Sequence, residues 1–296
     1  MTKKQHYVPQ FYLESWAIHK NNSLYRYDLE IKKSKLMSPK EILWENFYYE
    51  EDQDNPDNRI EKMLGDIENL AASIVKQINE ITNKHKGWKN KDLLRKELEN
   101  YLTEDRQKII KDFAVYQYLR VPEAIEQKRY ELQNSDIPNE LKEYNLNPGR
   151  FTESGYSYIR NNFDNLKMLV FCSFESYFLT CDWPCFDMRD DKEENLDAPF
   201  FDPILGEEIG KKEDVFALFP LTPRVSILFI HKDFNNNSIK IPNCSIHFSD
   251  CSDVKNRNEM IIKKAKKYVV SIEKNDDFIF ETAKKRKRET NPELFN

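Results

Sequence analysis

The strongest regular feature of the sequence is an apolar repeat with a helical period. Apolar side chains recur every three or four positions at Ile60, Met63, Leu64, Ile67, Leu70, Ala71, Ile74, Ile78 and Ile81. This spacing places them on one side of a helix. Because such a helix must cover its apolar side with another layer, we expect a long amphipathic helix over residues 60–82, packed on a larger core.

Other segments repeat the helical pattern over shorter lengths. The sequence predicts helices at residues 92–102, 104–132 and 253–272, with a kink or restart at Pro122 because proline disrupts a helix interior. A short helix is expected within residues 6–17, since Pro9 suits a first-turn position.

Strand-like segments lie on both sides of this helical region. Residues 23–37 predict two short strands joined by a turn, while residues 166–182 and 214–231 each predict a pair of strands. Residues 133–165 are polar and predict a connection with one short helix, and the acid-rich segment 187–197 predicts a solvated loop. We therefore predict an α+β fold, with long N-terminal helices packed on a mixed or antiparallel sheet in the C-terminal half.

The predicted domain organisation follows from the order of these segments. Residues 1–272 are expected to form one elaborated domain, with a helical lobe at about 55–165. A second, sheet-containing lobe is expected to consist of residues from about 166 to 272 together with the N-terminal hairpin. Residues 273–296 are expected to be a charged tail, in which the basic run 284–288 resembles a nucleic-acid patch but is more typical of a solvated end.

Composition excludes several classes of protein. The chain has only 6 glycines among 296 residues and no GxGxxG or GxxxxGK[ST] motif, which argues against a phosphate-binding glycine loop. A formal net charge of −5 argues against a protein that binds nucleic acid through its overall charge. The same net charge is compatible with a local basic groove. There is no signal-peptide pattern and no window of ~20 apolar residues. We expect a cytoplasmic protein without a membrane partner.

The five cysteines give no regular metal or disulfide pattern. They are Cys172, Cys181, Cys185, Cys244 and Cys251. Together with His247 they offer soft ligands for zinc, but the spacing matches no common zinc knuckle. The odd number and apolar surroundings favour reduced, buried thiols.

A few polar residues interrupt the apolar patterns. Arg120 falls on the apolar side of its predicted helix, with Gln117 at the edge of that side. A buried guanidinium needs an anion, which either a structural carboxylate or a substrate phosphate can supply. Glu61 and Glu68 are seven residues apart and nearly in line on the long helix. They are either carboxylates that converge on one site or ordinary charges at the boundary of the apolar side.

Two further positions carry the same ambiguity between structure and function. Asp182 ends an apolar strand before a proline turn, where it either serves a site or caps backbone. His6, beside a helix entry, is either a general base or a hydrogen-bonding structural residue.

The motifs taken together resemble domain-of-unknown-function family 4238, a bacterial family. The resemblance runs from residue 6 to about 272 and rests on a His-x-Val-Pro-x-x-Tyr-Leu opening at His6, Val8, Pro9, Tyr12 and Leu13, then Trp16, Tyr48, Tyr49, Glu61, Glu68, Gln117, Arg120, Pro122, Thr180, Asp182, Pro184, Pro220, Leu221, Pro223, Asn258 and Ala265. Trp183 departs from the smaller polar residue usual in the family, and the 187–197 segment resembles an insertion. The resemblance implies an association with mobile elements and defence loci.

The resemblance selects one dispersed polar set, and three hypotheses apply to it. The set is His6, Glu61, Glu68, Gln117, Arg120, Asp182 and Asn258. The first hypothesis is a metal-assisted phosphodiesterase or nuclease acting in bacterial defence, together with a defence-system partner protein. The second is a non-catalytic module that binds a nucleotide, nucleic acid or phage-derived ligand. The third is a buried ion-pair network with a purely structural role.

The hydrolase hypothesis gives each residue of the set a role. Glu61, Glu68 and Asp182 are the predicted ligands of Mg²⁺ or Mn²⁺. His6 is the predicted general acid or base, and Arg120 the predicted phosphate-binding cation. Gln117 and Asn258 are then expected to orient water or substrate.

Overall fold

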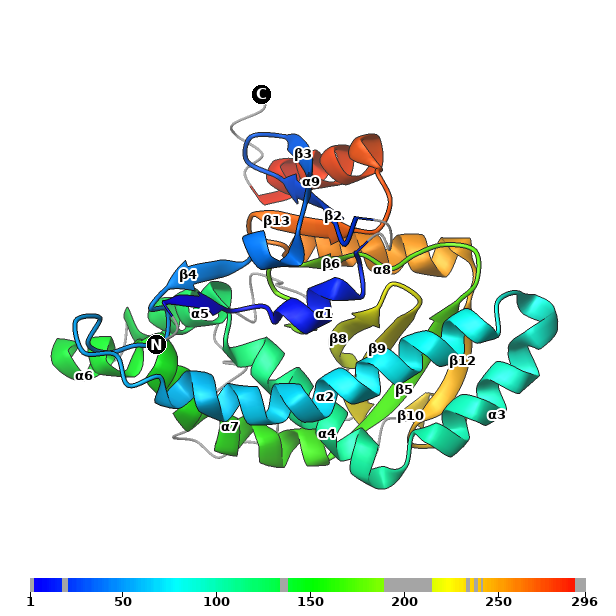
Figure 1. The fold of residues 1–296 in the computed structure, drawn as a ribbon, viewed down its shortest axis with the longest axis horizontal. Coiled ribbons are helices and arrows are strands. Elements are labelled where there is room, and N and C mark those ends of the chain that lie inside the picture. The colour runs from blue at the N-terminus through cyan, green and yellow to red at the C-terminus, as the bar shows by residue number, and fades with distance from the viewer. Residues whose placement is uncertain are drawn as a thin grey trace.

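The fold is α+β, with helices packed on sheets of mixed and antiparallel strands (Figure 1). The computed structural model describes residues 3–17, 21–133, 138–188, 215–232, 235–236, 239–240 and 242–290. The helices are α1 Gln10–Glu14, α2 Arg59–Lys84, α3 Lys91–Tyr101, α4 Glu104–Leu119, α5 Pro122–Gln133, α6 Asn139–Asn145, α7 Pro148–Asp164, α8 Cys251–Lys264 and α9 Asp276–Thr290, with short 3-10 turns η1 Pro39–Glu41 and η2 Trp88–Asn90.

The largest sheet lies in the C-terminal half of the chain. Its strands follow the order β12-β5-β9-β8-β7, in which β12 and β5 are parallel and the other neighbours antiparallel. The bounds are β5 Leu166–Ser173, β7 Phe186–Asp187, β8 Val215–Thr222, β9 Val225–His231 and β12 Ser245–Ser249. The predicted strand pair at residues 214–231 is confirmed by β8 and β9.

A second sheet joins the two ends of the described chain. Its order is β3-β2-β13-β6, all antiparallel. The bounds are β2 Leu24–Asp28, β3 Lys33–Met37, β6 Thr180–Cys181 and β13 Tyr268–Ser271. The predicted hairpin at residues 23–37 is confirmed by β2 and β3, which lie beside α9 in Figure 1. The two strands predicted at residues 166–182 are β5 and β6, which belong to different sheets.

Two short antiparallel pairs complete the strands. β1 Lys4–His6 pairs with β4 Trp44–Asn46, and β10 Asn235–Asn236 pairs with β11 Ile239–Lys240. The first pair holds the N-terminus beside the segment that leads into α2.

Helix α4 forms the centre of the core. All of its side chains from Ile110 to Leu119 are buried, because α2 and α7 pack on two sides of it and α1 and the sheet on others. Phe113 is fully buried with ring centroids 5.3 Å from Phe11, 6.1 Å from Tyr12 and 5.7 Å from Phe219 of β8. The aromatic residues of the N-terminal motif are therefore core residues.

The predicted long helices are confirmed with small shifts in their ends. α2 covers the 60–82 segment, and α3 covers the 92–102 segment. The 104–132 segment divides into α4 and α5 on either side of Arg120, so the predicted restart at Pro122 is present. Only Gln10–Glu14 is helical within the 6–17 segment, because Lys4–His6 pairs as a strand.

Two expectations for segments between or after the long helices were wrong. Residues 133–165 contain α6 and the 17-residue α7, which buries Phe151, Ile159 and Phe163. Pro148 begins α7, where a missing N–H costs nothing, and does not interrupt it. The predicted 253–272 helix ends at Lys264, and the apolar residues after it form β13.

The predicted charged tail contains α9, which begins at Asp276. α9 packs its buried Ile279 and Ala283 against the core, and the Tyr27 ring lies 5.8 Å from Phe280. Only residues 187 and 188 of the predicted acidic loop at 187–197 are among the described residues. The rest of that predicted loop lies outside them.

Candidate functional site

Arg120 links the N-terminal strand to two helices from inside the core. It lies at the C-terminal end of α4, and only 2% of it is exposed. Its Nε donates to the Tyr49 hydroxyl at 3.0 Å, Nη1 to Glu68 Oε1 at 2.5 Å, and Nη2 to the His6 carbonyl oxygen at 2.5 Å. Burial lowers the pKa of Arg120, but Tyr49 and Glu68 outweigh it and raise the pKa above its ordinary value. The guanidinium is therefore a permanent cation.

Glu61 precedes Glu68 of this ion pair by about two turns of α2. Burial raises the pKa of Glu61 to about 7; Arg120 opposes the shift, while Glu68 and Glu50 add to it. Its Oε2 is buried and has no hydrogen-bond partner among the described residues. Near neutral pH the carboxyl exchanges readily between its protonated and ionised forms.

Glu50 has a different role from the other acids nearby. It accepts from Gln5 Nε2 at 2.6 Å and from the backbone amides of Asp57 and Asn58 at 3.0 and 3.3 Å. Gln5 in turn accepts from the Tyr49 amide at 2.8 Å. These bonds fix the start of α2, and with it the position of Glu61.

Several buried polar atoms near Arg120 lack a partner in the described chain. They are the His6 Nε2, the Tyr48 hydroxyl and both amide atoms of Gln117, which is fully buried and three residues before Arg120 on α4. Burial, Lys4 and Arg120 lower the pKa of His6 to about 4, so its ring is neutral at pH 7. Such atoms call for a partner, because an unsatisfied buried polar group costs ~1–3 kcal/mol.

We refer to six of these residues as the inner polar cluster. They are His6, Tyr48, Glu61, Glu68, Gln117 and Arg120. They come from β1, the segment after β4, α2 and α4. Five of the seven residues predicted from the sequence lie in it.

Two glycines shape the surroundings of the cluster. Gly65 lies between Glu61 and Glu68 on the same side of α2, and, apart from its chain neighbours and the backbone of α2, no described heavy atom lies within 4 Å of an added Cβ. A Cβ on Gly149 would lie 2.4 Å from the Tyr49 carbonyl oxygen and 3.2 Å from the Ile60 side chain. Gly65 therefore leaves open space beside the two carboxylates, whereas Gly149 lets α7 approach the backbone of the cluster closely.

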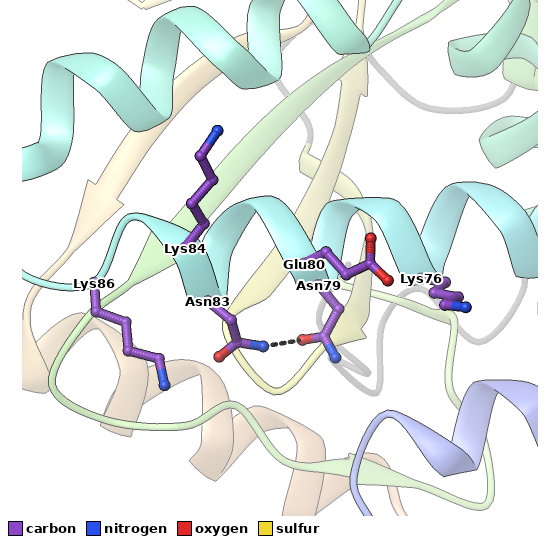
Figure 2. Close-up of a pocket in the computed structure, with 6 residues that line it drawn as sticks. All are labelled: Lys76, Asn79, Glu80, Asn83, Lys84 and Lys86. Atoms are coloured by element: carbon purple, nitrogen blue, oxygen red, sulfur yellow. Dashed lines mark hydrogen bonds between the residues drawn. The ribbon is translucent and has the colours of Figure 1, made fainter.

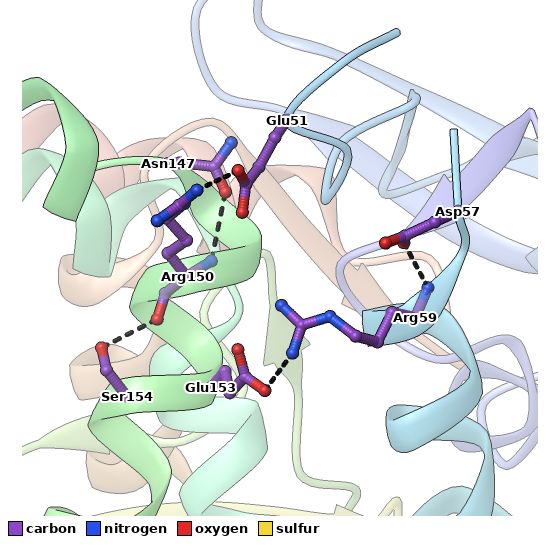
Figure 3. A network of polar contacts seen from close by, with 7 residues as sticks. All are labelled: Glu51, Asp57, Arg59, Asn147, Arg150, Glu153 and Ser154. Carbon is purple, nitrogen blue, oxygen red and sulfur yellow. Dashed lines mark hydrogen bonds and ion pairs between the residues drawn. The ribbon is translucent and has the colours of Figure 1, made fainter. Parts of the chain in front are cut away.

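The loop between β4 and α2 is held against α7 by polar contacts (Figure 3). Arg150 pairs with Glu51, and Arg59 pairs with Glu153. The Arg59 amide also donates to Asp57 at 2.7 Å. These exposed pairs each contribute ~0–1 kcal/mol, so they orient the loop more than they stabilise the fold.

Asp182 binds backbone and does not join the cluster. Its Oδ1 accepts from the Lys266 amide at 2.9 Å, and its Oδ2 accepts from the Lys267 and Tyr268 amides at 2.7 and 2.8 Å. Burial raises the pKa of Asp182 to about 6, and the three amide donors oppose that shift. The carboxylate thus closes the turn between α8 and β13, which is the backbone-capping alternative for this residue.

Asn258 also binds backbone. Its Oδ1 accepts from the Leu179 amide at 2.8 Å, and its Nδ2 donates to the Tyr177 carbonyl at 2.9 Å. The amide therefore holds the segment before β6 against α8.

The three predicted metal ligands do not form one ligand group. Among the residues that the structure describes, no cluster of three His, Cys, Asp or Glu side chains has the arrangement needed to hold a metal ion. Glu68 is paired with Arg120, and Asp182 binds backbone amides. Binding of Mg²⁺ or Mn²⁺ stays a prediction that no observation tests.

The cysteines are free thiols. Cys172, Cys181 and Cys185 are buried, Cys244 is half-buried and Cys251 is exposed. The buried-thiol prediction is confirmed for the first three of these.

Sequence reasoning missed several residues of the site. The sequence patterns indicate Tyr48 and Tyr49 only as an aromatic pair, and they do not single out Gln5, Glu50 or Gly65. No local sequence pattern singles out the Tyr-Tyr-Glu run at 48–50, although all three residues are buried in the structure.

Comparison with known proteins identifies a family but no relative of established function. The family described as "Protein of unknown function (DUF4238)" matches residues 4–275. No curated protein and no solved structure matches the chain. In the part of the chain that the structure describes, no helix has the length and apolar character needed to cross a membrane.

Proposed function

The chain belongs to the DUF4238 family, and we propose that it is a hydrolase whose site is the inner polar cluster, with Glu61 as the proton-transferring residue. One observation carries the proposal: a half-buried carboxyl with an unpartnered oxygen lies beside a fixed, permanently charged guanidinium. Carboxyl groups in such surroundings are typical of general acid–base sites.

The other members of the cluster fit supporting roles. Arg120 is held by three acceptors inside the core, so it supplies a fixed positive field and does not move to clamp a substrate. The neutral His6 ring, the Tyr48 hydroxyl and the Gln117 amide offer donors and acceptors for a bound polar group. The open space at Gly65 gives access beside Glu61 and Glu68.

A phosphoester is the substrate class that we propose, because two exposed lysines, Lys76 of α2 and Lys86 just after α2, offer positive charge to it. Since Arg120 is buried and fully engaged, those lysines replace it as the expected phosphate-binding cations. Mg²⁺ or Mn²⁺ and a role in bacterial defence stay predictions, and no step here depends on them.

The test is hydrolysis of bis(p-nitrophenyl) phosphate and of labelled oligonucleotides by wild-type protein, with and without Mg²⁺, Mn²⁺ or EDTA. Glu61→Gln should lower the rate at least ~100-fold, the scale of general acid–base catalysis, and remove a limb of the pH–rate profile near pH 7. Asp66→Asn, which makes the same carboxylate-to-amide change at an exposed position of α2, is the matched control. Wild-type rates in a folded Glu61→Gln variant would refute the assignment.

A second candidate is a binding module that performs no chemistry. The unpartnered amide of Gln117 favours it, because a buried carboxamide with unpaired donor and acceptor atoms suits recognition of a polar ring such as a nucleobase. In this case nucleotides raise the melting temperature without turnover, and Gln117→Met removes that increase. A nucleotide effect that persists in Gln117→Met would contradict this candidate.

A further inference from the structure

The side of α2 that carries Glu61 and Glu68 continues toward the C-terminal end of the helix. Lys76, Asn79 and Asn83 follow at the helical spacing of three and four residues, and Lys86 lies just past the helix end. An open groove with a volume of about 580 Å³ lies here. Figure 2 shows the residues that line it. Its lining, which we call the lysine groove, consists of Lys76, Asn79, Glu80, Asn83, Lys84 and Lys86.

The charge of the lysine groove is positive and partly unused. The lining contains three lysines and one glutamate. Lys84 Nζ binds Glu97 at 2.9 Å, but Lys76 and Lys86 are exposed and form no ion pair with any described residue. Asn83 Nδ2 donates to Asn79 Oδ1 at 3.3 Å, so the two amides that line the groove point toward each other in Figure 2. Free ammonium groups beside amide donors are suited to phosphate oxygens.

An exposed aromatic residue follows the groove-lining residues in the sequence. Trp88 lies two residues after Lys86 and is 41% exposed. Its Nε1 donates to Glu175 at 2.6 Å, and its ring meets Phe174 edge-on at 5.3 Å and Phe248 at 6.4 Å. The indole is thus held in place while much of it faces solvent, as in aromatic platforms on which bases stack.

We propose that the lysine groove and Trp88 together bind single-stranded nucleic acid. Lys76 and Lys86 are ten residues apart, which is on the order of 15 Å at 1.5 Å per residue. This separation suits successive phosphates of a strand better than one nucleotide. A single strand has unpaired bases that can stack on Trp88, whereas the bases of a duplex are already stacked and paired.

The strand-binding proposal also gives the proposed hydrolase a substrate. A strand in the lysine groove that continues along the same side of α2 passes Gly65 and reaches Glu61, ~22 Å from Lys76. Only this last step, in which the bound strand is the substrate, rests on the proposed function. Binding itself does not depend on it.

The test is fluorescence anisotropy with a labelled 12-nucleotide oligothymidylate, titrated with full-length Glu61→Gln protein across a series of salt concentrations. Lys76→Glu with Lys86→Glu should weaken binding at least ~10-fold and reduce the slope of log K against log salt by ~1.4, or ~0.7 for each lost phosphate contact. Trp88→Ala should weaken binding at least ~5-fold, and Trp88→Phe should retain most of it.

The control is Lys33→Glu with Lys35→Glu, which makes the same charge change at exposed positions of β3. Equal losses in the two double variants would overturn the proposal, as would an unchanged affinity in the groove variant. Binding of a 12-base-pair duplex as tightly as the strand would also overturn it.

The two proposals fail separately. If the strand binds the groove but neither it nor bis(p-nitrophenyl) phosphate is hydrolysed by wild-type protein, the proposed function is wrong and the binding site stands. If the small substrate is hydrolysed in a Glu61-dependent way but no strand binds, the lysine groove assignment is wrong and the hydrolase stands.

Discussion

Replacing Arg120 with alanine should be among the most destabilising single changes in this protein. The guanidinium is 2% exposed and is the common donor to Tyr49, Glu68 and the His6 carbonyl. Removing it leaves these acceptors without their donor. The strand at the N-terminus, α2 and α4 lose the residue that connects them.

The size of the loss follows from the surroundings of each acceptor. The Tyr49 hydroxyl and the His6 carbonyl each lose one bond but keep the 3.3 Å bond in which Tyr49 donates to His6, so each loss lies toward the lower end of ~1–3 kcal/mol. The Glu68 side chain is 25% exposed, so water recovers part of the lost interaction there. Because breaking a buried ion pair costs ~3–5 kcal/mol, we expect Arg120→Ala to lower the free energy of unfolding by ~3–5 kcal/mol.

Urea unfolding followed by circular dichroism measures this free energy, provided that the m-value is unchanged. Arg120→Lys keeps the charge but not the forked geometry, and should cost less than the alanine variant. If Arg120→Ala does not fold, Tyr49→Phe, at ~1 kcal/mol, and Glu68→Gln measure the same contacts one at a time. A loss below ~1 kcal/mol in a folded Arg120→Ala variant would refute the reasoning.

Four further substitutions test the site and the segments that hold it. Folding raises the pKa of Glu61 from 4.5 to about 7, so the free energy of unfolding of the wild type falls as the pH rises from 4.5 to 7. In urea unfolding, Glu61→Gln should therefore be more stable than wild type at pH 8 and lose that advantage at pH 5. Asp182→Ala leaves three backbone amides unpaired and should lower unfolding stability by ~3 kcal/mol; a loss under ~1 kcal/mol would contradict the turn-closing role. Gly65→Ala should raise the melting temperature, because a helical glycine costs up to ~1 kcal/mol and space is open, whereas Gly149→Ala should lower it; the same sign in both would contradict the packing.

Much of the fold could be predicted because helix and hairpin signals are local. The period of the 60–82 segment is set by side chains within one helix, and the hairpin at 23–37 by residues within one turn. The sequence predicts a helix at residues 265–271 because their apolar residues fit a helical period. The pairing of β13 with β2, 240 or more positions away in the chain, turns the end of this segment into a strand.

The site was predictable in part for a similar reason. A single arginine on the apolar side of α4 requires an anion, and this requirement can be read from the residue pattern of one helix. The same reasoning did not find Tyr48, Gln5 or Glu50, because no local pattern distinguishes them from ordinary core or loop residues.

The α+β class, the long helices and the presence of polar residues inside apolar faces all follow from the residue pattern alone. Which of those polar residues meet depends on the packing of distant segments. Arg120 finds its partners 52, 71 and 114 positions away, and Asp182 finds its amides 84 to 86 positions away. Local periodicity can place a charge on a buried face, but the counter-charge comes from whichever segments the tertiary structure brings beside it.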